Sequence, residues 1–374
     1  MARIIYGVCG DGIGHATRSK ATIEHLKENG HEVKIVSSRK GYDYLNEYYD
    51  VLKIFGFKIS NKDGEVVIFD TFNESALNLL KYGFPTIEKL AHLIDTFKPE
   101  LAITDFEPFV SIVSRIKRIP AISIDNQHVI THCSLQYPRS WRNDFLIAEA
   151  VCRSVIIRAE HYFLTCFFAP KIKMKEQIKA TLVGPILRKE ILQQNPTNNN
   201  HIMVYMRAPE RLNAIIQILE QSEKKTFLIY GLNGDTPAKK NIIFKKHNED
   251  EFYRDLAGAE AVITNGGHSL LSESLYLGKP IYSNPTKRDF EQMINAYYIE
   301  KLGYGLYQLE PTIQRMRIFL SSLDMYRTNI NKDHDNFNGN ESFFDKLDFK
   351  INSILLPGIK PSGIKTEVFK KEHD

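Results

Sequence analysis

The chain has 374 residues, of which 43% are hydrophobic and 25% are charged, a composition typical of folded globular proteins rather than disordered or fibrous ones. This length predicts two domains, since single hydrophobic cores stop growing beyond about 250–300 residues. The formal net charge of +4 is too small to indicate a nucleic-acid-binding protein, because such binding depends on a marked excess of Lys and Arg. We expect no nucleic-acid partner.

The usual signals for export or membrane insertion are also missing from the sequence. The first residues do not form the long apolar region of a signal peptide. No apolar run reaches the about 20 residues that a membrane-spanning helix needs. We therefore expect a cytoplasmic protein, with peripheral contact to the inner membrane face as an open alternative.

Strand-like and helix-like segments alternate through the first half of the chain. The expected strands are 4–9, 32–37, 51–54, 66–69, 101–104 and 121–124, and the expected helices are 16–29, 41–48 and 86–97. Such alternation predicts a parallel, doubly wound sheet. The segment 138–180 reads as helix-like sequence and does not repeat this rhythm.

The polar stretch 193–200 is the best linker candidate, and the alternation restarts after it. The expected strands are 202–205, 226–230, 242–244, 261–264 and 280–283, and the expected helices are 211–221, 249–258, 269–277, 289–302, 312–323 and 342–355. The sequence thus predicts an α/β protein with two Rossmann-like domains, 1–185 and 200–335. Residues 336–374 would form a helix, which could cross back to the first domain, and a polar tail.

A glycine-rich turn follows the expected strand 261–264, in the segment TNGGHSLLSE. In open parallel sheets, ligands bind outside the carboxyl ends of the strands. Gly266 and Gly267 would let the backbone turn sharply and come close to a ligand. The helix after them would point free N–H groups at that ligand, which suits a diphosphate.

Side chains of this segment could add further contacts. His268 and Ser269 could donate hydrogen bonds, and Glu273, one turn further on, could accept them from ribose hydroxyls. The next expected helix carries Gln292 and Asn295 on one face, because they are three residues apart. Ordinary explanations exist for both groups: a strand–helix turn with a Ser cap, and surface positions of a helix.

The segment 261–305, with ITNGGHSLLSESLYLGKP, EQMINA and LGYG, closely resembles the donor-binding domain of GT-B glycosyltransferases. The MurG-like (family 28 type) UDP-sugar transferases of prokaryotes are the most similar group. The N-terminal GDGIGHATR and the segments TDFEP and IDNQH resemble this group too. The resemblance covers most of the chain up to 305 and implies a GT-B fold, with two Rossmann-like doubly wound parallel-sheet domains facing each other across a cleft.

The resemblance also implies roles for the residues of the donor site. Glu273 would hold the ribose, and the helix that begins at His268 and Ser269 would face the diphosphate. The donor sugar would contact Glu291, Gln292 and Asn295, and the loop 245–248 would bracket the base, with Gly231 and Phe244 at the ends of nearby strands. Arg207, after the strand 202–205, could meet the diphosphate, although this region lacks the glycine-rich loop of MurG-type enzymes.

The N-terminal loop contains Gly10, Gly12 and Gly14, which superficially suggests a dinucleotide-binding fold. However, His15 stands where the dinucleotide fingerprint needs Gly or Ala. A nicotinamide enzyme would also leave the second α/β half unexplained. The family resemblance instead places this loop on the acceptor side, together with Asn126.

Glycosyl transfer with inversion needs a base that deprotonates the acceptor hydroxyl as it attacks C1. An imidazole titrates near neutral pH, so His15 is the leading candidate. Asp105 could orient that histidine or act as the base itself, and His128 is a second candidate histidine. Each of the three could instead be a buried polar residue that caps a helix.

The segment 137–179 interleaves aromatic side chains (Trp141, Phe145, Phe163, Phe167 and Phe168) with arginines. Such a face could lie on an anionic membrane and present a lipid-linked acceptor. We favour the alternative, in which these residues belong to amphipathic helices that pack on the first domain.

The expected activity is metal-independent transfer of a hexose or N-acetylhexosamine from a nucleotide-sugar, a UDP-sugar by resemblance, to an acceptor hydroxyl. No cofactor other than the nucleotide-sugar co-substrate is expected. The acceptor stays open between a lipid-linked glycan, a polymer and a small molecule. A nucleotide-sugar 2-epimerase of the same fold and a non-catalytic nucleotide-sugar-binding protein are the alternatives.

Overall fold

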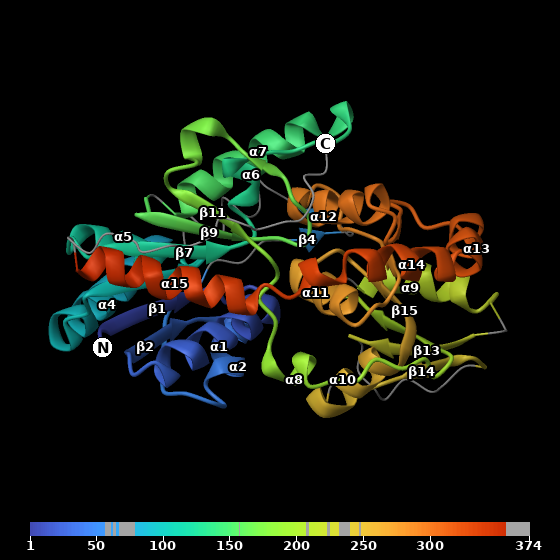
Figure 1. Ribbon diagram of the computed structural model, residues 1–374, viewed down its shortest axis with the longest axis horizontal. Coiled ribbons are helices and arrows are strands. Elements are labelled where there is room, and N and C mark those ends of the chain that lie inside the picture. Colours follow the sequence, from blue (N-terminus) through green and yellow to red (C-terminus); the bar gives the residue numbers. More distant parts are fainter. Residues whose placement is uncertain are drawn as a thin grey trace. The chain divides into compact units, whose positions relative to one another are not determined.

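The computed structural model describes residues 1–56, 61–62, 65–66, 79–156, 158–206, 209–222, 225–231, 240–246 and 248–356 (Figure 1). The chain divides into two compact units. Unit 1 comprises Met1–Ser60, Val67–Arg188 and Asn338–Asp374, and unit 2 comprises Asn61–Val66 and Lys189–Phe337.

Unit 1 contains a parallel sheet of seven strands in the order β11-β9-β7-β6-β1-β2-β3. The strands are β1 (Arg3–Val8), β2 (Glu32–Ser37), β3 (Val51–Lys53), β6 (Leu101–Asp105), β7 (Ala121–Asp125), β9 (His161–Thr165) and β11 (Ala180–Val183). The chain builds outward from β1 to β2 and β3, and then continues on the other side of β1 with β6. The order therefore reverses between β1 and β6, and the carboxyl ends of these two strands mark the expected ligand position of a doubly wound sheet.

Helices cover both faces of this sheet, as Figure 1 shows. Successive side chains of a strand point to opposite faces, so β1 contributes to two cores. Ile4, Tyr6 and Val8 pack in one core with α1 (Ile13–Glu28) and α15 (Asn340–Leu355), and Ile5 packs in the other with α4 (Phe84–Phe97) and α5 (Pro108–Ile116).

The helix α15 comes from the far end of the chain but belongs to unit 1. Phe343, Leu347 and Ile351 recur every four residues along one face of α15 and are buried in the core beside β1 and α1. At the start of α15, the Asn340 side chain both donates to and accepts from the backbone of Leu187, at 2.8 Å in each case. This helix completes a face that the N-terminal segments alone would leave open.

Unit 2 contains a second parallel sheet, in the order β14-β13-β12-β15-β16-β17. The strands are β12 (His201–Tyr205), β13 (Thr226–Tyr230), β14 (Ile242–Phe244), β15 (Ala259–Thr264), β16 (Ile281–Ser283) and β17 (Gly305–Tyr307). One core joins this sheet to α9 (Pro209–Leu219), α13 (Ile313–Ser321) and α14 (Leu323–Lys332), and the other joins it to α10 (Glu249–Gly258) and α11 (His268–Tyr276). Here the strand order reverses between β12 and β15.

The remaining described elements are shorter or lie at the edges of the units. They are α2 (Arg39–Leu45), α6 (Val129–His132), α7 (Arg142–Val155), α8 (Lys189–Leu192), α12 (Phe290–Lys301), the strand pairs β4 (Asn61–Lys62) with β5 (Glu65–Val66) and β8 (Cys133–Ser134) with β10 (Lys171–Ile172), and the single turns η1 (Leu79–Gly83), η2 (Arg139–Trp141), η3 (Met174–Glu176) and η4 (His334–Phe337).

The prediction of helix-like sequence over 138–180 is wrong for its second half. The helix α7 ends at Val155, and the next regular element is the strand β9, which pairs with both β7 and β11 and whose residues are all buried. A short apolar run of this kind fits a buried strand and a buried helix segment equally well. This run becomes a strand because it pairs with β7 on one side and with β11 on the other.

Three other differences concern smaller segments. The sequence did not predict α5, α14 or β17. In the stretch 193–200, the N–H groups of Thr197 and Asn199 donate to the carbonyls of Ala257 and Gly258 at 2.9 and 2.8 Å, so this candidate linker is bound to unit 2. The predicted strand 66–69 lies outside the described residues beyond Val66.

Candidate functional site

The reversal point of the unit 1 sheet brings His15 and Asp105 together. His15 lies in the first turn of α1, directly after the glycine-rich loop that follows β1, and Asp105 is the last residue of β6. The neighbouring strands β1 and β6 pair in parallel, with Val8 opposite Asp105. As a result, His15 Nδ1 lies 2.7 Å from Asp105 Oδ1.

Asp105 is completely buried and surrounded by donors. Arg18 Nε lies 2.7 Å from Oδ2, Arg18 Nη2 lies 2.5 Å from Oδ1, and the Ser19 hydroxyl donates to Oδ2 at 3.0 Å. Burial would raise the pKa of Asp105, but the charge of Arg18 and the hydrogen bonds from His15 and Arg18 outweigh it, and the pKa is lowered overall. Asp105 is therefore a carboxylate that accepts hydrogen bonds.

This carboxylate determines the state of the His15 ring. His15 Nδ1 also lies 2.8 Å from Arg18 Nη2, but Asp105 only accepts and the Gln127 side-chain nitrogen faces Nε2, so we assign the proton of neutral His15 to Nδ1 and the lone pair to Nε2. Nε2 lies 3.4 Å from the Gln127 side-chain nitrogen, and the His15 side chain is 13% exposed. The Phe106 ring stacks alongside at 6.3 Å between ring centroids and 14° between planes. Nε2 is thus oriented as a hydrogen-bond acceptor or a base.

The glycines of the N-terminal loop have a structural explanation. A Cβ on Gly10 would lie 2.0 Å from the Ser38 carbonyl oxygen, so the loop passes too close to the end of β2 for any side chain. Gly12 is the N-cap residue of α1, and the Gly14 carbonyl accepts from the Thr17 hydroxyl at 3.0 Å. Gly10 is therefore required by contacts within the chain, and the acceptor-side role of Gly12 and Gly14 stays a prediction.

A second His–Asp pair lies at the end of the next strand. His128 Nδ1 lies 2.7 and 2.9 Å from the two carboxylate oxygens of Asp125, which also accepts from the Ser123 hydroxyl at 2.6 Å. Burial would raise the pKa of Asp125, but His128 and Ser123 outweigh it and hold the pKa well below its usual range. Both members of this pair are buried, with His128 only 2% exposed. Asn126 is buried as well, and its side chain donates to the Thr165 carbonyl at 2.8 Å, which ties β7 to β9.

In unit 2, the glycine turn lies between β15 and α11, at the reversal point of the sheet. Gly266 has φ +122°, and a Cβ there would lie 2.8 Å from the Gln292 carbonyl oxygen, so only glycine fits. Gly267 is the exposed N-cap residue of α11, with nothing within 4 Å of its Cβ position. The first N–H groups of α11 have no acceptor within the helix, and together with the helix dipole they suit an anion.

The side chains predicted to contact a ligand at this turn differ in burial. Ser269 is half-buried, whereas His268 and Glu273 are buried on α11. Next to them, the Ser272 hydroxyl donates to the His268 carbonyl at 2.8 Å. The predicted contact of Glu273 with ribose hydroxyls stays a prediction.

On α12, Gln292 and Asn295 are engaged within unit 2. Asn295 is buried, and its side-chain nitrogen donates to the Gly266 carbonyl at 3.2 Å. The Gln292 side chain donates to Asp289 Oδ2 at 2.7 Å and accepts from the N–H of Thr286 at 3.0 Å. Asn295 therefore shapes the glycine turn, and Gln292 holds the loop before α12. Glu291, half-buried beside Gln292, lies at the start of the same helix.

The other predicted donor residues lie at strand ends of unit 2. Gly231 directly follows β13, and the half-buried Phe244 ends β14. In the loop after Phe244, Lys245 forms ion pairs with Glu251 and, at 3.4 Å, with Asp255. Arg207 and the His247 position of this loop lie outside the described residues.

Sequence reasoning missed Arg18, Ser19 and Gln127. For the first two, the signal is the segment HATRSK at the start of α1. It contains few apolar residues, although most of its residues are buried. Polar residues that are buried on a helix need partners. Gln127 gave no local signal, since only the order of the strands brings it near His15.

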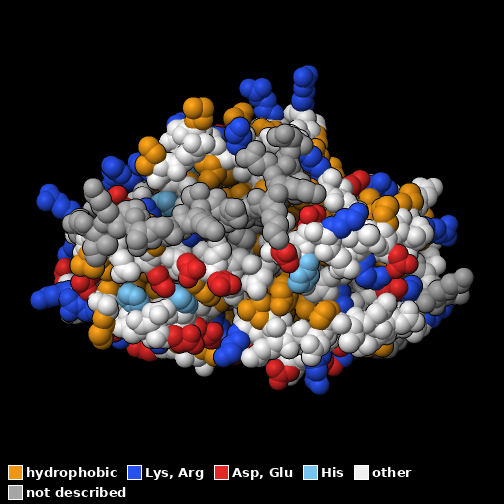
Figure 2. Space-filling view, viewed as in Figure 1, with side chains coloured by type: hydrophobic (Ala, Val, Ile, Leu, Met, Phe, Trp, Pro, Cys, Tyr) orange, Lys and Arg blue, Asp and Glu red, His pale blue; other side chains and the backbone are white. Residues whose placement is uncertain are grey.

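The aromatic residues of segment 137–179 mostly belong to the core. Trp141, Phe163, Phe167 and Phe168 are buried, which supports packing and leaves few of these rings for a membrane face. On the face shown in Figure 2, Lys and Arg side chains are interspersed with Asp and Glu. No helix within the described ranges is both long and apolar enough to cross a membrane. Nor do the described residues include a group of three or more His, Cys, Asp or Glu side chains that could hold a metal ion.

Solved glycosyltransferases share this fold. The calicheamicin glycosyltransferase CalG4 aligns with a TM-score of 0.64 and 16% sequence identity, over 96% of this chain and 100% of that one. Arabidopsis thaliana UGT89C1, solved in complex with UDP-L-rhamnose, aligns with a TM-score of 0.61 and 13% identity, over 95% and 99% of the two chains. At these identities the likeness shows a shared GT-B fold.

Sequence relatives point the same way. A protein of Methanosarcina acetivorans described as an uncharacterized glycosyltransferase is 25% identical over 333 residues, which cover 81% of this chain and 84% of the relative. A protein of Methanosarcina mazei with the same description is 25% identical over 329 residues, with the same coverage. The finer resemblance to MurG-like enzymes stays a prediction. The model of the family described as glycosyl transferase family 1 matches residues 2–324. The chain therefore belongs to glycosyl transferase family 1 and is a glycosyltransferase of GT-B fold.

Proposed function

We propose that this enzyme transfers a hexose or N-acetylhexosamine from a UDP-sugar to an acceptor hydroxyl, with inversion at C1 and with His15 as the general base. The observation that carries the proposal is the 2.7 Å contact between His15 Nδ1 and the buried carboxylate of Asp105. A histidine held in this way has one defined tautomer and one ring nitrogen that can receive a proton.

In the proposed reaction, the acceptor hydroxyl donates to His15 Nε2. As its oxygen attacks C1 of the donor sugar, the proton moves to Nε2 and the bond between C1 and the diphosphate oxygen breaks. Asp105 then stabilises the imidazolium through Nδ1, while Arg18 and Ser19 keep the carboxylate in place. A single displacement of this kind inverts C1 and needs no enzyme nucleophile.

The structure favours His15 over the two other candidate bases. Asp105 is completely buried and accepts hydrogen bonds from His15, Arg18 and Ser19, so its oxygens are already occupied. His128 forms a comparable pair with Asp125, but it follows β7, whereas His15 and Asp105 lie at the reversal point of the sheet, where the ligand of a doubly wound sheet is expected. A base must come within hydrogen-bond distance of the hydroxyl that it deprotonates.

The leaving UDP needs its growing negative charge stabilised. We assign this task to the N-terminus of α11, where the Gly266–Gly267 turn lets a diphosphate approach the backbone N–H groups. Such stabilisation needs no metal ion. The preference for UDP is supported by the UDP-L-rhamnose complex of UGT89C1, whose fold is similar, and by the MurG-like sequence features of the segment 261–305.

The first experiment measures nucleotide binding from thermal unfolding with UDP, dTDP, GDP and CMP. A ligand that binds only the folded state stabilises it by about 2.7 kcal/mol at a hundredfold excess over its dissociation constant. We expect UDP to stabilise the wild type and the His15→Ala variant alike. The Glu273→Ala variant should lose this effect. An absent response to all four nucleotides would contradict the donor site.

The second experiment measures UDP release and the fate of the sugar. With UDP-glucose or UDP-N-acetylglucosamine and a panel of hydroxyl acceptors, we expect transfer that His15→Ala slows by about 10²–10⁴-fold. Release of a different sugar from UDP-N-acetylglucosamine without any acceptor would instead indicate a 2-epimerase. Tight UDP binding without turnover in either variant would indicate a non-catalytic binding protein.

A further inference from the structure

A cavity of about 260 Å³ lies in unit 1, next to the proposed base but separate from it. Its inner wall includes His128, His132 and Tyr162, and its outer wall includes Arg158, Glu176 and Lys179. The volume is below the about 300–1,000 Å³ of typical drug or cofactor sites. The cavity therefore suits a ligand of about the size of one sugar ring.

His128 supplies a buried hydrogen-bond acceptor to this cavity. Its Nδ1 is bound to the Asp125 carboxylate, so the proton of the neutral ring is assigned to Nδ1 and the lone pair to Nε2. Nε2 is buried and has no hydrogen-bond partner among the residues that the structure describes. An unsatisfied buried acceptor is costly, and a hydroxyl group of a ligand would satisfy it.

His132 and Glu176 add two further acceptors. His132 Nδ1 lies 2.7 Å from the Thr131 hydroxyl oxygen, and Nε2 lies 3.7 Å from Glu176 Oε2. Burial lowers the pKa of His132 to about 4, so the ring is neutral at pH 7. Nδ1 also lies 3.2 Å from the His128 carbonyl oxygen, which can only accept, so the proton is assigned to Nδ1 and the lone pair to Nε2. His132 Nε2 and the Glu176 carboxylate are thus two acceptors in the cavity lining, and they match the hydroxyl groups of a sugar.

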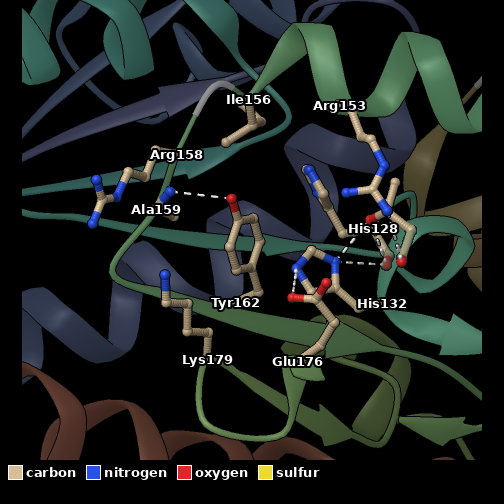
Figure 3. A pocket seen from close by; sticks show the side chains of 10 residues that line it. His128, His132, Arg153, Ile156, Arg158, Ala159, Tyr162, Glu176 and Lys179 are labelled. Carbon is tan, nitrogen blue, oxygen red and sulfur yellow. Dashed lines mark hydrogen bonds and ion pairs between the residues drawn. The ribbon is translucent and has the colours of Figure 1, made fainter. Parts of the chain in front are cut away.

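The outer wall carries positive charge. Figure 3 shows Arg158 and Lys179 on one side of the Tyr162 ring, and His132 and Arg153 on the other. Arg153 is paired with Glu149 at 2.9 Å. Within the described part of the chain, the exposed side chains of Arg158 and Lys179 form no ion pair. Two unpaired cations match the charge of about −1.5 to −2 on a phosphate monoester at pH 7 better than the single charge of a carboxylate.

We propose that this cavity binds a monosaccharide that carries a phosphate group, with its hydroxyls donating to His128, His132 and Glu176 and its phosphate between Arg158 and Lys179. The Phe106 ring lies next to both histidines, with its centroid 6.3 Å from that of His15 and 5.8 Å from that of His128. The ligand would thus lie one aromatic ring away from the proposed base. The inference goes beyond the proposed function, because the acceptor hydroxyl would lie at His15 Nε2, whereas His15 is not among the residues that line this cavity.

Isothermal titration of the full-length protein tests the site without any donor sugar. The ligands are the 6-phosphates of glucose, mannose and N-acetylglucosamine, glucose 1-phosphate, the three neutral sugars, and inorganic phosphate. We expect at least one sugar phosphate to bind about tenfold or more tightly than both its neutral sugar and inorganic phosphate. Only the sugar phosphate gains binding free energy both from its phosphate and from its hydroxyl groups.

Variants of the outer wall locate the binding. Replacement of both cations (Arg158→Gln with Lys179→Gln) should weaken binding about tenfold or more, and both side chains are exposed, so the fold should persist. Lys171→Gln removes an exposed lysine outside the cavity and should change nothing.

Three outcomes would overturn the inference: no sugar phosphate binds, inorganic phosphate binds as tightly as the sugar phosphates, or the double variant binds like the wild type. Titration with UDP in the same samples reports the donor site separately. Sugar-phosphate binding that persists without UDP binding would support the cavity and contradict the proposed function.

Discussion

Arg18 binds both oxygens of the Asp105 carboxylate, with Nε 2.7 Å from Oδ2 and Nη2 2.5 Å from Oδ1. Two hydrogen bonds from one planar guanidinium fix the carboxylate in orientation as well as in position. Because Asp105 in turn holds His15, an arginine that is buried away from solvent determines where the proposed base lies. We class Arg18 as a positioning residue.

Replacing Arg18 by methionine should destabilise unit 1 by about 3–5 kcal/mol, because it leaves the buried Asp105 carboxylate without its cation. Urea unfolding measures the loss through Trp141, the only tryptophan of the chain, which is buried in unit 1. Lys117→Met is the matched control, since it breaks a solvent-exposed pair with Asp95 and should cost about 1 kcal/mol or less. Equal losses in the two variants would contradict the role of Arg18.

The two glycines before α11 should respond differently to alanine. Gly266→Ala places a Cβ 2.8 Å from the Gln292 carbonyl at φ +122°, and we expect a loss of about 1–3 kcal/mol and weaker UDP binding. Gly267→Ala meets no atom within 4 Å, at φ −65°, and should cost less than about 1 kcal/mol. Chemical unfolding and UDP titration of both variants check this. Equal losses of stability and UDP binding in the two variants would show that the turn geometry at Gly266 does not cause the loss.

Stability should fall as the pH is lowered from 7 to 5. Burial, together with Lys350, lowers the pKa of His161 to about 3, and burial lowers that of His132 to about 4. Between these values and the ordinary 6.5, the unfolded chain binds protons that the folded chain does not, so acid favours unfolding. His161→Gln should therefore lose about 1–2 kcal/mol less between pH 7 and pH 5 than the wild type does. Parallel losses in urea titrations of both proteins would show that His161 is not responsible.

The C-terminal helix should be essential to unit 1. Leu347→Ala removes a fully buried side chain from the interface of α15 with the N-terminal core and should cost about 2–5 kcal/mol. The loss should appear in the Trp141 fluorescence transition, although the substitution is far from Trp141 in sequence. Asp345→Ala, at an exposed position of the same helix, should stay within about 0.5 kcal/mol of the wild type. An unchanged Trp141 transition in Leu347→Ala would mean that α15 does not stabilise this unit.

Local patterns in the sequence were sufficient for much of the fold. The strands 32–37, 226–230 and 242–244 and the helix 249–258 have the same bounds in the structure as in the prediction, because each depends on short-range periodicity and on flanking turn residues. The glycine turn before α11 was equally readable, since Gly266 has a positive φ that other residues rarely adopt.

The sequence also determined the family and the residue types of the site, but the tertiary structure decided which of them meet. Asp105 and Arg18 are 87 residues apart, and they come together only because β6 pairs with β1. Asn295 donates to the carbonyl of Gly266, 29 residues earlier, and its predicted contact with the donor sugar stays a prediction. The run 161–165 became the strand β9 because a place between β7 and β11 buries all five of its residues. Each of these outcomes depends on the order of strands in a sheet, which is set by contacts between distant segments and leaves no periodic signal in the sequence.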